Sequence, residues 1–147
     1  MIKPSTSRTS QSWRTNASSQ WTKFVQRGDE FLWDAPVGDV NNVGTNNGVQ
    51  TVTVTVPTGI QVNALFGARA DYGSASCAIW FSAFDVANVT TGGPLAMLIT
   101  GASTGNCAGM FNMRTSTLGQ FRFNGNSPNS FYSIATFGWI DRRGRDT

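Results

Sequence analysis

The final apolar segment of the chain constrains the fold most, because it alternates with a period of two and then ends in a charged tail. Phe131, Phe137 and Trp139 fall on one side of an extended chain, and the acidic and basic residues 141–146 follow at once. A strand at the end of a chain pairs with strands that come earlier in the sequence. Residues 131–140 therefore predict a strand that closes a β core.

Composition favours strands over helices throughout the chain. Charged residues make up only 13% of the 147 residues, there are 16 glycines, and Glu30 is the sole glutamate. Helices usually carry more Glu, Lys and Leu, whereas many short strands joined by turns need Gly, Ser, Thr and Asn. We expect an all-β domain, large enough to fold around one core without a metal.

Short apolar segments recur along the chain between turn residues. Strands are predicted at residues 24–25, 31–33, 51–56, 60–69, 77–86, 95–100, 108–114, 118–123 and 131–140, with a turn at 27–29 and a long loop at 41–48. No internal repeat is present, which argues against a propeller or a solenoid. The spacing predicts a jelly-roll-like antiparallel β-sandwich with an extended N-terminal arm.

Residues 77–86 are apolar on both faces of the predicted strand. Ile79 and Phe81 fall on one face, and Trp80, Phe84 and Val86 fall on the other. Such a strand is either central in a sandwich and covered on its outer side, or lies at a subunit interface. We predict that Trp80, Phe84 and Val86 contribute to an oligomer interface.

The first 22 residues are rich in Ser and Thr and nearly lack aliphatic residues, so they cannot form a core alone. We expect residues 1–22 to form an arm and residues 23–147 to form the sandwich domain. Trp13, Arg14, Trp21 and Lys23 would anchor the arm. Tryptophans beside cations could also stack on single-stranded nucleic acid, but the low charge favours pockets on a protein shell or a neighbouring subunit.

Basic residues gather near the two ends of the chain, and the net charge is only +3. So small a charge favours an acidic protein surface over a phosphate backbone, and we expect no nucleic-acid partner. Arg142, Arg143 and Arg145 are predicted to make polar contacts at the C-terminus, with acids such as Asp29 or Asp71.

The absence of histidine excludes Ser-His-Asp and Cys-His nucleophilic sites and His-ligated zinc. Two carboxylate pairs, Asp29 with Glu30 and Asp34 with Asp39, are the nearest candidates for glycosidase-type chemistry. Solvated acids in turns explain both pairs better. We therefore predict no catalytic residue, no cofactor and no metal, and expect that the protein is not an enzyme.

Two cysteines, Cys77 and Cys107, are too few for a disulfide framework. They are either buried thiols or a single bridge. The polar N-terminus lacks the apolar region of a signal peptide, and no apolar run is long enough to span a bilayer, so we expect no membrane association.

Two segments resemble the small virion proteins of tailed bacteriophages. The first is residues 28–41, which begins with Gly28-Asp29-Glu30-Phe31, and the second is the ending Phe131-Tyr132-Ser133-Ile134-Ala135-Thr136-Phe137-Gly138-Trp139-Ile140-Asp141-Arg142-Arg143-Gly144-Arg145-Asp146. Together these two segments hold 30 of the 147 residues, about a fifth of the chain.

The resemblance implies a structural protein of the virion that is assembled in the host cytoplasm. Proteins of this kind are capsid decoration (cement) proteins, head fibres or tail fibres, and they often form trimers. We expect a homo-oligomer that decorates the capsid and contacts the major capsid protein or other virion proteins. The alternative is a fibre or receptor-binding module whose loops at residues 41–48 and 124–129 contact a host glycan or protein.

Overall fold

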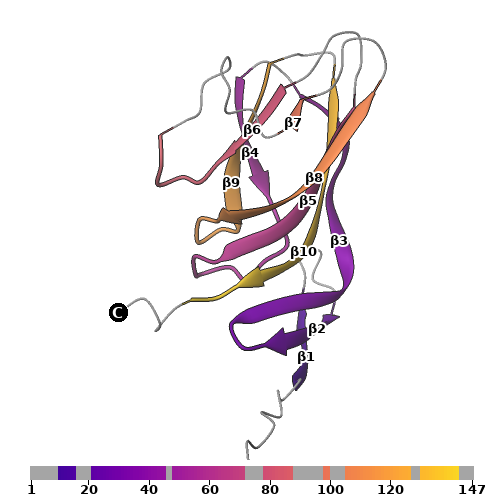
Figure 1. The fold of residues 1–147 in the computed structure, drawn as a ribbon. Coiled ribbons are helices and arrows are strands. Elements are labelled where there is room, and N and C mark those ends of the chain that lie inside the picture. Colours follow the sequence, from indigo (N-terminus) through magenta and orange to yellow (C-terminus); the bar gives the residue numbers. More distant parts are fainter. Residues whose placement is uncertain are drawn as a thin grey trace, which may run out of the picture.

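The computed structural model describes residues 10–15, 21–45, 48–71, 78–87, 98–99, 105–126 and 130–142. These residues form ten β-strands and no helix, which confirms the all-β prediction (Figure 1). A helix long and apolar enough to cross a membrane is absent from this part of the chain.

The strands form two antiparallel sheets. Their bounds are β1 (Ser10–Thr15), β2 (Trp21–Arg27), β3 (Glu30–Gly44), β4 (Gly48–Thr53), β5 (Asn63–Asp71), β6 (Ala78–Ser82), β7 (Leu98–Ile99), β8 (Asn106–Arg114), β9 (Gln120–Gly125) and β10 (Phe131–Ile140). The first sheet has the order β1-β2-β3-β10-β5-β8, and the second has the order β4-β9-β6-β7. All strand pairs are antiparallel.

The eight strands β3 to β10 interleave between the sheets as in a jelly roll. Strands β3, β10, β5 and β8 lie side by side in one sheet, and β4, β9, β6 and β7 make up the other. The last strand, β10, lies in the middle of its sheet between β3 and β5. The β-sandwich prediction is therefore confirmed, as is the expectation that residues 131–140 close the core.

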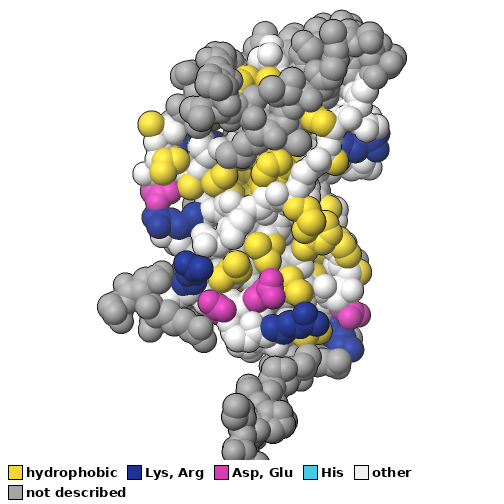
Figure 2. Space-filling model, viewed as in Figure 1, with side chains coloured by type: hydrophobic (Ala, Val, Ile, Leu, Met, Phe, Trp, Pro, Cys, Tyr) yellow, Lys and Arg dark blue, Asp and Glu magenta, His cyan; other side chains and the backbone are white. Residues whose placement is uncertain are grey.

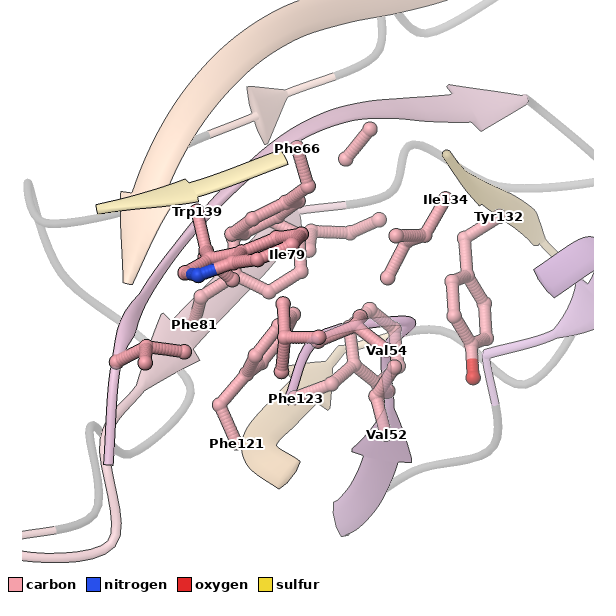
Figure 3. Close-up of a cluster of buried hydrophobic side chains, with 14 of the residues drawn as sticks. Val52, Val54, Phe66, Ile79, Phe81, Phe121, Phe123, Tyr132, Ile134 and Trp139 are labelled. Carbon is pink, nitrogen blue, oxygen red and sulfur yellow. The ribbon is translucent and has the colours of Figure 1, made fainter. Parts of the chain in front are cut away.

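Aromatic side chains from both sheets fill the space between them (Figure 3). The ring of Phe66 on β5 stacks on Phe121 of β9 with centroids 4.7 Å apart, and Phe123 stacks on Tyr132 at 4.1 Å. Each of these strands alternates buried and less buried residues, so one face of each strand supplies the core. The period-two pattern in the sequence thus marks the inner face of β5 correctly. It is wrong for β10, where Tyr132, Ile134 and Thr136 face the core and Phe131 is exposed. The register shift after Thr136 brings Trp139 to the core side.

Strand β3 is longer than the sequence indicates, and the predicted loop at residues 41–48 is wrong over its first half. Pairing with β10 continues to Gly44, which lies opposite Phe131. Asn42 takes a positive φ of 51°, which asparagine tolerates better than most residues. Backbone pairing with a central strand therefore outweighs the local turn preference of the asparagines.

The turn at residues 27–29 is confirmed, because β2 ends at Arg27, β3 begins at Glu30, and Gly28 has a positive φ of 65°. Of the residues in β3, those at 30–33 pair with β2. Pro36 lies beyond that pairing, so its missing N–H removes no hydrogen bond to β2.

The described part of the predicted N-terminal arm, residues 10–15 and 21–22, belongs to the first sheet. Strand β1 pairs with β2 from Ser10 opposite Gln26 to Thr15 opposite Trp21, and β2 continues to β3. The predicted boundary between residues 22 and 23 falls inside β2. Backbone hydrogen bonding can join a segment to a sheet without an apolar core of its own, which is why composition does not reveal this pairing.

Candidate interaction surface

The outer face of the first sheet is the most distinctive surface of the described residues. We use "outer face" for the side of β3, β10, β5 and β8 that points away from the second sheet. On β5 the residues Ala64, Phe66 and Ala68 are buried between the sheets, so Leu65 and Gly67 lie on the outer face.

A row of directly paired residues crosses all four strands of this face. Gly38 on β3 lies opposite Ala135 on β10, Ala135 lies opposite Gly67 on β5, and Gly67 lies opposite Met110 on β8. Three small residues are therefore followed by one long side chain. Met110 is 75% exposed, the highest exposure among the large hydrophobic side chains of the described residues.

The small residues form the floor of a groove of about 670 Å³. Phe137 lies along the groove, and Arg69, Ala108 and Met110 also line it. Phe137 occupies a register shift in β10, because Thr136 pairs with Phe66 and Gly138 pairs with Leu65. This extra residue aims an aromatic ring onto the outer face.

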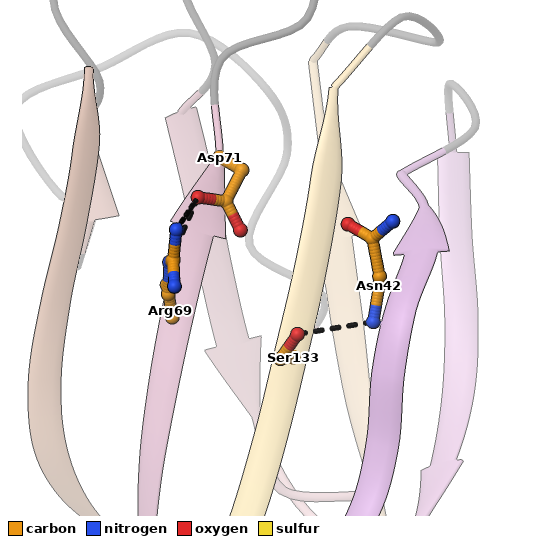
Figure 4. A network of polar contacts seen from close by, with 4 residues as sticks. All are labelled: Asn42, Arg69, Asp71 and Ser133. Atoms are coloured by element: carbon orange, nitrogen blue, oxygen red, sulfur yellow. Dashed lines mark hydrogen bonds and ion pairs between the residues drawn. The ribbon is translucent and has the colours of Figure 1, made fainter.

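Polar contacts bound the groove at one end of the strands (Figure 4). Arg69 and Asp71, two residues apart on β5, form an ion pair with Nη2 and Oδ1 2.6 Å apart. The main-chain N–H of Asn42 donates to Ser133 Oγ at 3.0 Å. Ser133 falls at a register shift between β10 and β3, where Asn42 has no paired residue on β10. The Ser133 hydroxyl therefore accepts the hydrogen bond of the Asn42 main-chain N–H.

Charge of either sign is sparse and mixed on this molecule. In the space-filling view, Lys and Arg side chains alternate with Asp and Glu, and they do not gather into a single field on the face in view (Figure 2). The cation Arg69 in the groove is already paired with Asp71. The groove therefore offers an apolar surface with a charge-balanced rim.

Among the described carboxylates, Asp39 has a pKa that its surroundings shift away from the usual value. It is the extra residue between Gly38 and Val40 in the pairing with β10, and its oxygens accept hydrogen bonds from the hydroxyls of Thr136 and Thr55, the latter at 2.5 Å. Burial raises the pKa of Asp39 above its usual value, and the two threonine bonds offset part of that effect. The carboxylate thus links β3 and β10 of the first sheet to the segment that follows β4.

The two carboxylates of the Asp34–Asp39 pair have different surroundings. Asp34 is exposed on β3, whereas Asp39 is half-buried and held by Thr55 and Thr136. No group of three or more Cys, Asp or Glu residues that could hold a metal occurs within the described ranges.

The residues predicted for the oligomer interface differ in exposure. Trp80 is only 3% exposed in the single chain, whereas Phe84 is 44% and Val86 53% exposed. Of the two alternatives for this segment, Trp80 fits a strand covered on its outer side. Phe84 and Val86 lie in the turn after β6, where Arg122 reaches them: its guanidinium carbon is 5.3 Å from the Phe84 ring centroid, and it donates to the Val86 carbonyl.

The predicted arm anchors lie on the hairpin of β1 and β2. Trp13 is opposite Lys23 in the pairing, Arg14 is next to Trp13 on β1, and Trp21 begins β2. The hairpin therefore places the four positions on the two strands at one edge of the first sheet.

The C-terminal arginines are only partly covered by the structure. Arg142 is exposed, while Arg143 and Arg145 lie outside the described residues. Of their predicted partners, Asp71 pairs with Arg69. The main-chain carbonyl of Asp29 accepts a hydrogen bond from the N–H of Asp141 at 2.8 Å, which fixes the start of the tail.

Cys107 is half-buried on the core side of β8, where it packs against the hydrophobic cluster. Cys77 lies outside the described residues. Both alternatives for the cysteines stay open.

No protein-family model matches this chain, and a search of curated proteins finds no match. The row of Gly38, Ala135, Gly67 and Met110 was not predicted from the sequence. Each small residue is unremarkable in its own segment, and only the pairing of strands places the four in one line.

Proposed function

We propose that this chain is a non-enzymatic structural component of a tailed-phage virion, and that it decorates the capsid and stabilises the head. The observation that carries the proposal is the outer face, which is an apolar and charge-poor surface on a jelly-roll domain. Jelly rolls are common in viral capsid proteins, although a fold alone does not define a function. A face of this kind serves association better than catalysis.

Two further features support an assembly role. The half-buried carboxylate of Asp39 accepts hydrogen bonds from Thr136 on β10 and from Thr55 in the segment after β4, which suits a structural role. Strand β1 ends the order of the first sheet, so within the described residues one of its edges has no neighbouring strand. Such an edge can accept a strand from another protein.

We propose that the β1–β2 hairpin, with Trp13, Arg14, Trp21 and Lys23, is the part that contacts the major capsid protein or another virion protein. The protein would act as a homo-oligomer, for which the resemblance to virion proteins favours a trimer. In this arrangement the sandwich domains bind one another and the hairpins bind the shell.

The second candidate function is a head-fibre or tail-fibre module that binds a host glycan or protein. It is favoured by Asn41 and Asn42 near the end of β3, which offer exposed side-chain amides at the rim of the sandwich beside the exposed apolar side chain of Val43. Jelly rolls are also found in lectins.

Labelling of virus particles tests both candidates. Particles purified from the culture that produces this protein are treated with a gold-labelled antibody against the chain and imaged. Gold on the head supports capsid decoration, and gold on the tail or at fibre tips supports the alternative. Particles that carry no label, while the protein remains in the soluble fraction, would contradict a virion role.

A further inference from the structure

We propose that copies of this chain bind one another through the outer face of β3, β10, β5 and β8, with Met110 of one copy seated in the small-residue groove of the next. The inference rests on the proposed structural function, for which it names the partner and the contact surface. The partner is a second copy of the same chain.

Shape is the first argument, because one face carries both a projection and a recess. Met110 is 75% exposed, and the neighbouring positions in its row are Gly67, Ala135 and Gly38. An added Cβ at Gly38 would meet no atom within 4 Å, so the chain itself does not fill that end of the groove. Two copies of such a face can interlock, because the projection of each matches the recess of the other.

Composition is the second argument. Interfaces between identical subunits are enriched in Met and aromatic residues and depleted in charge at their centre. The middle of this face holds Phe137 and small residues, Met110 projects from its edge strand β8, and the Arg69–Asp71 ion pair lies near the ends of the strands. Since Arg69 is neutralised within its own chain, two such faces meet without like-charge repulsion.

The same charge balance disfavours other occupants. A nucleic acid or an anionic membrane is held by unpaired Lys and Arg side chains, whereas the arginine of this groove has a carboxylate 2.6 Å away. A second copy presents an equally neutral and apolar surface, so the two faces can be buried against each other without unpaired charge.

The size of the face suits an interface. Strands β5 and β8 are each nine residues long. With about 3.4 Å per residue and about 4.8 Å between strands, four strands cover roughly 600 Å² before side-chain relief is counted. A specific interface buries about 800 Å² on each partner. The face can therefore supply most of such an area.

Substitution of Met110 tests the contact. In Met110→Asp the projection becomes a charge that would lie unpaired in an apolar groove, so we expect the dissociation constant of self-association to rise at least tenfold. Leu118→Asp is the matched control, because Leu118 is also a large exposed side chain, at 63%, but lies in the turn between β8 and β9. The oligomeric mass of the full-length protein is measured by sedimentation velocity over a range of concentrations, and folding is checked by circular dichroism.

A wild-type mass above the 15.8 kDa of one chain, lost in Met110→Asp and kept in Leu118→Asp, supports the inference. If Met110→Asp fails to fold, Ala108→Arg puts a charge at another exposed position on the same face. Wild-type protein that is monomeric at about 100 µM, or folded face variants that associate as tightly as wild type, overturn it. Particle labelling tests the proposed function separately. Label on virions together with a monomeric protein in solution would support the function and contradict the interface. An oligomer that depends on Met110 but is absent from particles would support the interface and contradict the function.

Discussion

The ring of Phe137 lies against Gly67, so closely that a Cβ atom at position 67 would stand 2.9 Å from Cε2 of that ring. The glycine lets an aromatic side chain lie low on the outer face instead of standing away from it. Because Phe137 and Gly67 are on neighbouring strands, this contact shapes the groove that Met110 is proposed to enter in another copy.

Gly138 on β10 should be far less tolerant of a side chain than Gly38 on β3. A Cβ at Gly138 would stand 2.0 Å from the main-chain oxygen of Phe31, so the β3 and β10 backbones would have to separate. We expect Gly138→Ala to lower the free energy of unfolding by about 3 kcal/mol or more. Gly38→Ala, which meets no atom within 4 Å, should change it by less than about 1 kcal/mol. Urea unfolding of both variants measures the difference, and equal midpoints would contradict the close approach of the two strands.

Asp39 should make the stability of the protein depend on pH in an unusual direction. Its pKa is raised in the folded state, chiefly by burial, so the folded protein binds the proton more tightly than the unfolded chain does. The contribution of this group to the free energy of unfolding is therefore greatest at low pH. It falls as pH rises from the usual value of 3.8 through the raised pKa.

Asp39→Asn removes this titration. We expect the stability of Asp39→Asn relative to wild type to increase between pH 4 and pH 7, as measured by urea unfolding at each pH. Asp34→Asn removes the same charge from an exposed position on the same strand and should change stability little. A relative stability of Asp39→Asn that decreases with rising pH would contradict the raised pKa.

Phe66 should be among the most costly core residues to truncate. It is fully buried, stacks on Phe121 at 4.7 Å and meets Phe81 edge-on at 5.2 Å, so its ring joins the two sheets. We expect Phe66→Ala to cost about 3 to 5 kcal/mol in thermal or chemical unfolding. Phe131→Ala, at a position that is 40% exposed, should cost less than about 1 kcal/mol. A similar loss in both variants would show that the core does not lie where β5 meets β9.

Arg122 should hold the turn after β6. Its Nη2 donates to the main-chain oxygens of Ala83, at 2.6 Å, and of Val86, while its guanidinium lies over Phe84. Lysine has no planar fork that could keep all three contacts, so Arg122→Lys should cost about 1 kcal/mol and speed amide exchange in residues 84–87. In the control Arg114→Lys, the altered residue pairs with Asp85 while largely exposed, and exchange should change little. Unchanged exchange in Arg122→Lys would mean that the turn holds its shape without this residue.

The fold class and the inner face of β5 could be predicted from the sequence, whereas the inner face of β10 could not, because the register shift at Phe137 changes which side of the strand meets the core. Alternation is a local property of side chains, so residues 131–140 could be predicted as a strand with the bounds that β10 has. The turn at Gly28 follows from the conformational freedom of glycine in the same local way. The interface role of Phe84 and Val86, the arm contacts and the virion assignment stay predictions.

The neighbours of each strand, and with them the outer face, depend on tertiary packing and could not be predicted from any one segment. Gly38, Gly67, Met110 and Ala135 come from four separate segments, and their line across the sheet depends on registers that no single segment encodes. Pairing with β10 likewise carried β3 through Asn42, against the local preference for a loop. The alternation of side chains is a local property of each segment. The register between strands depends on which faces can be buried together, and this is a property of the whole sandwich.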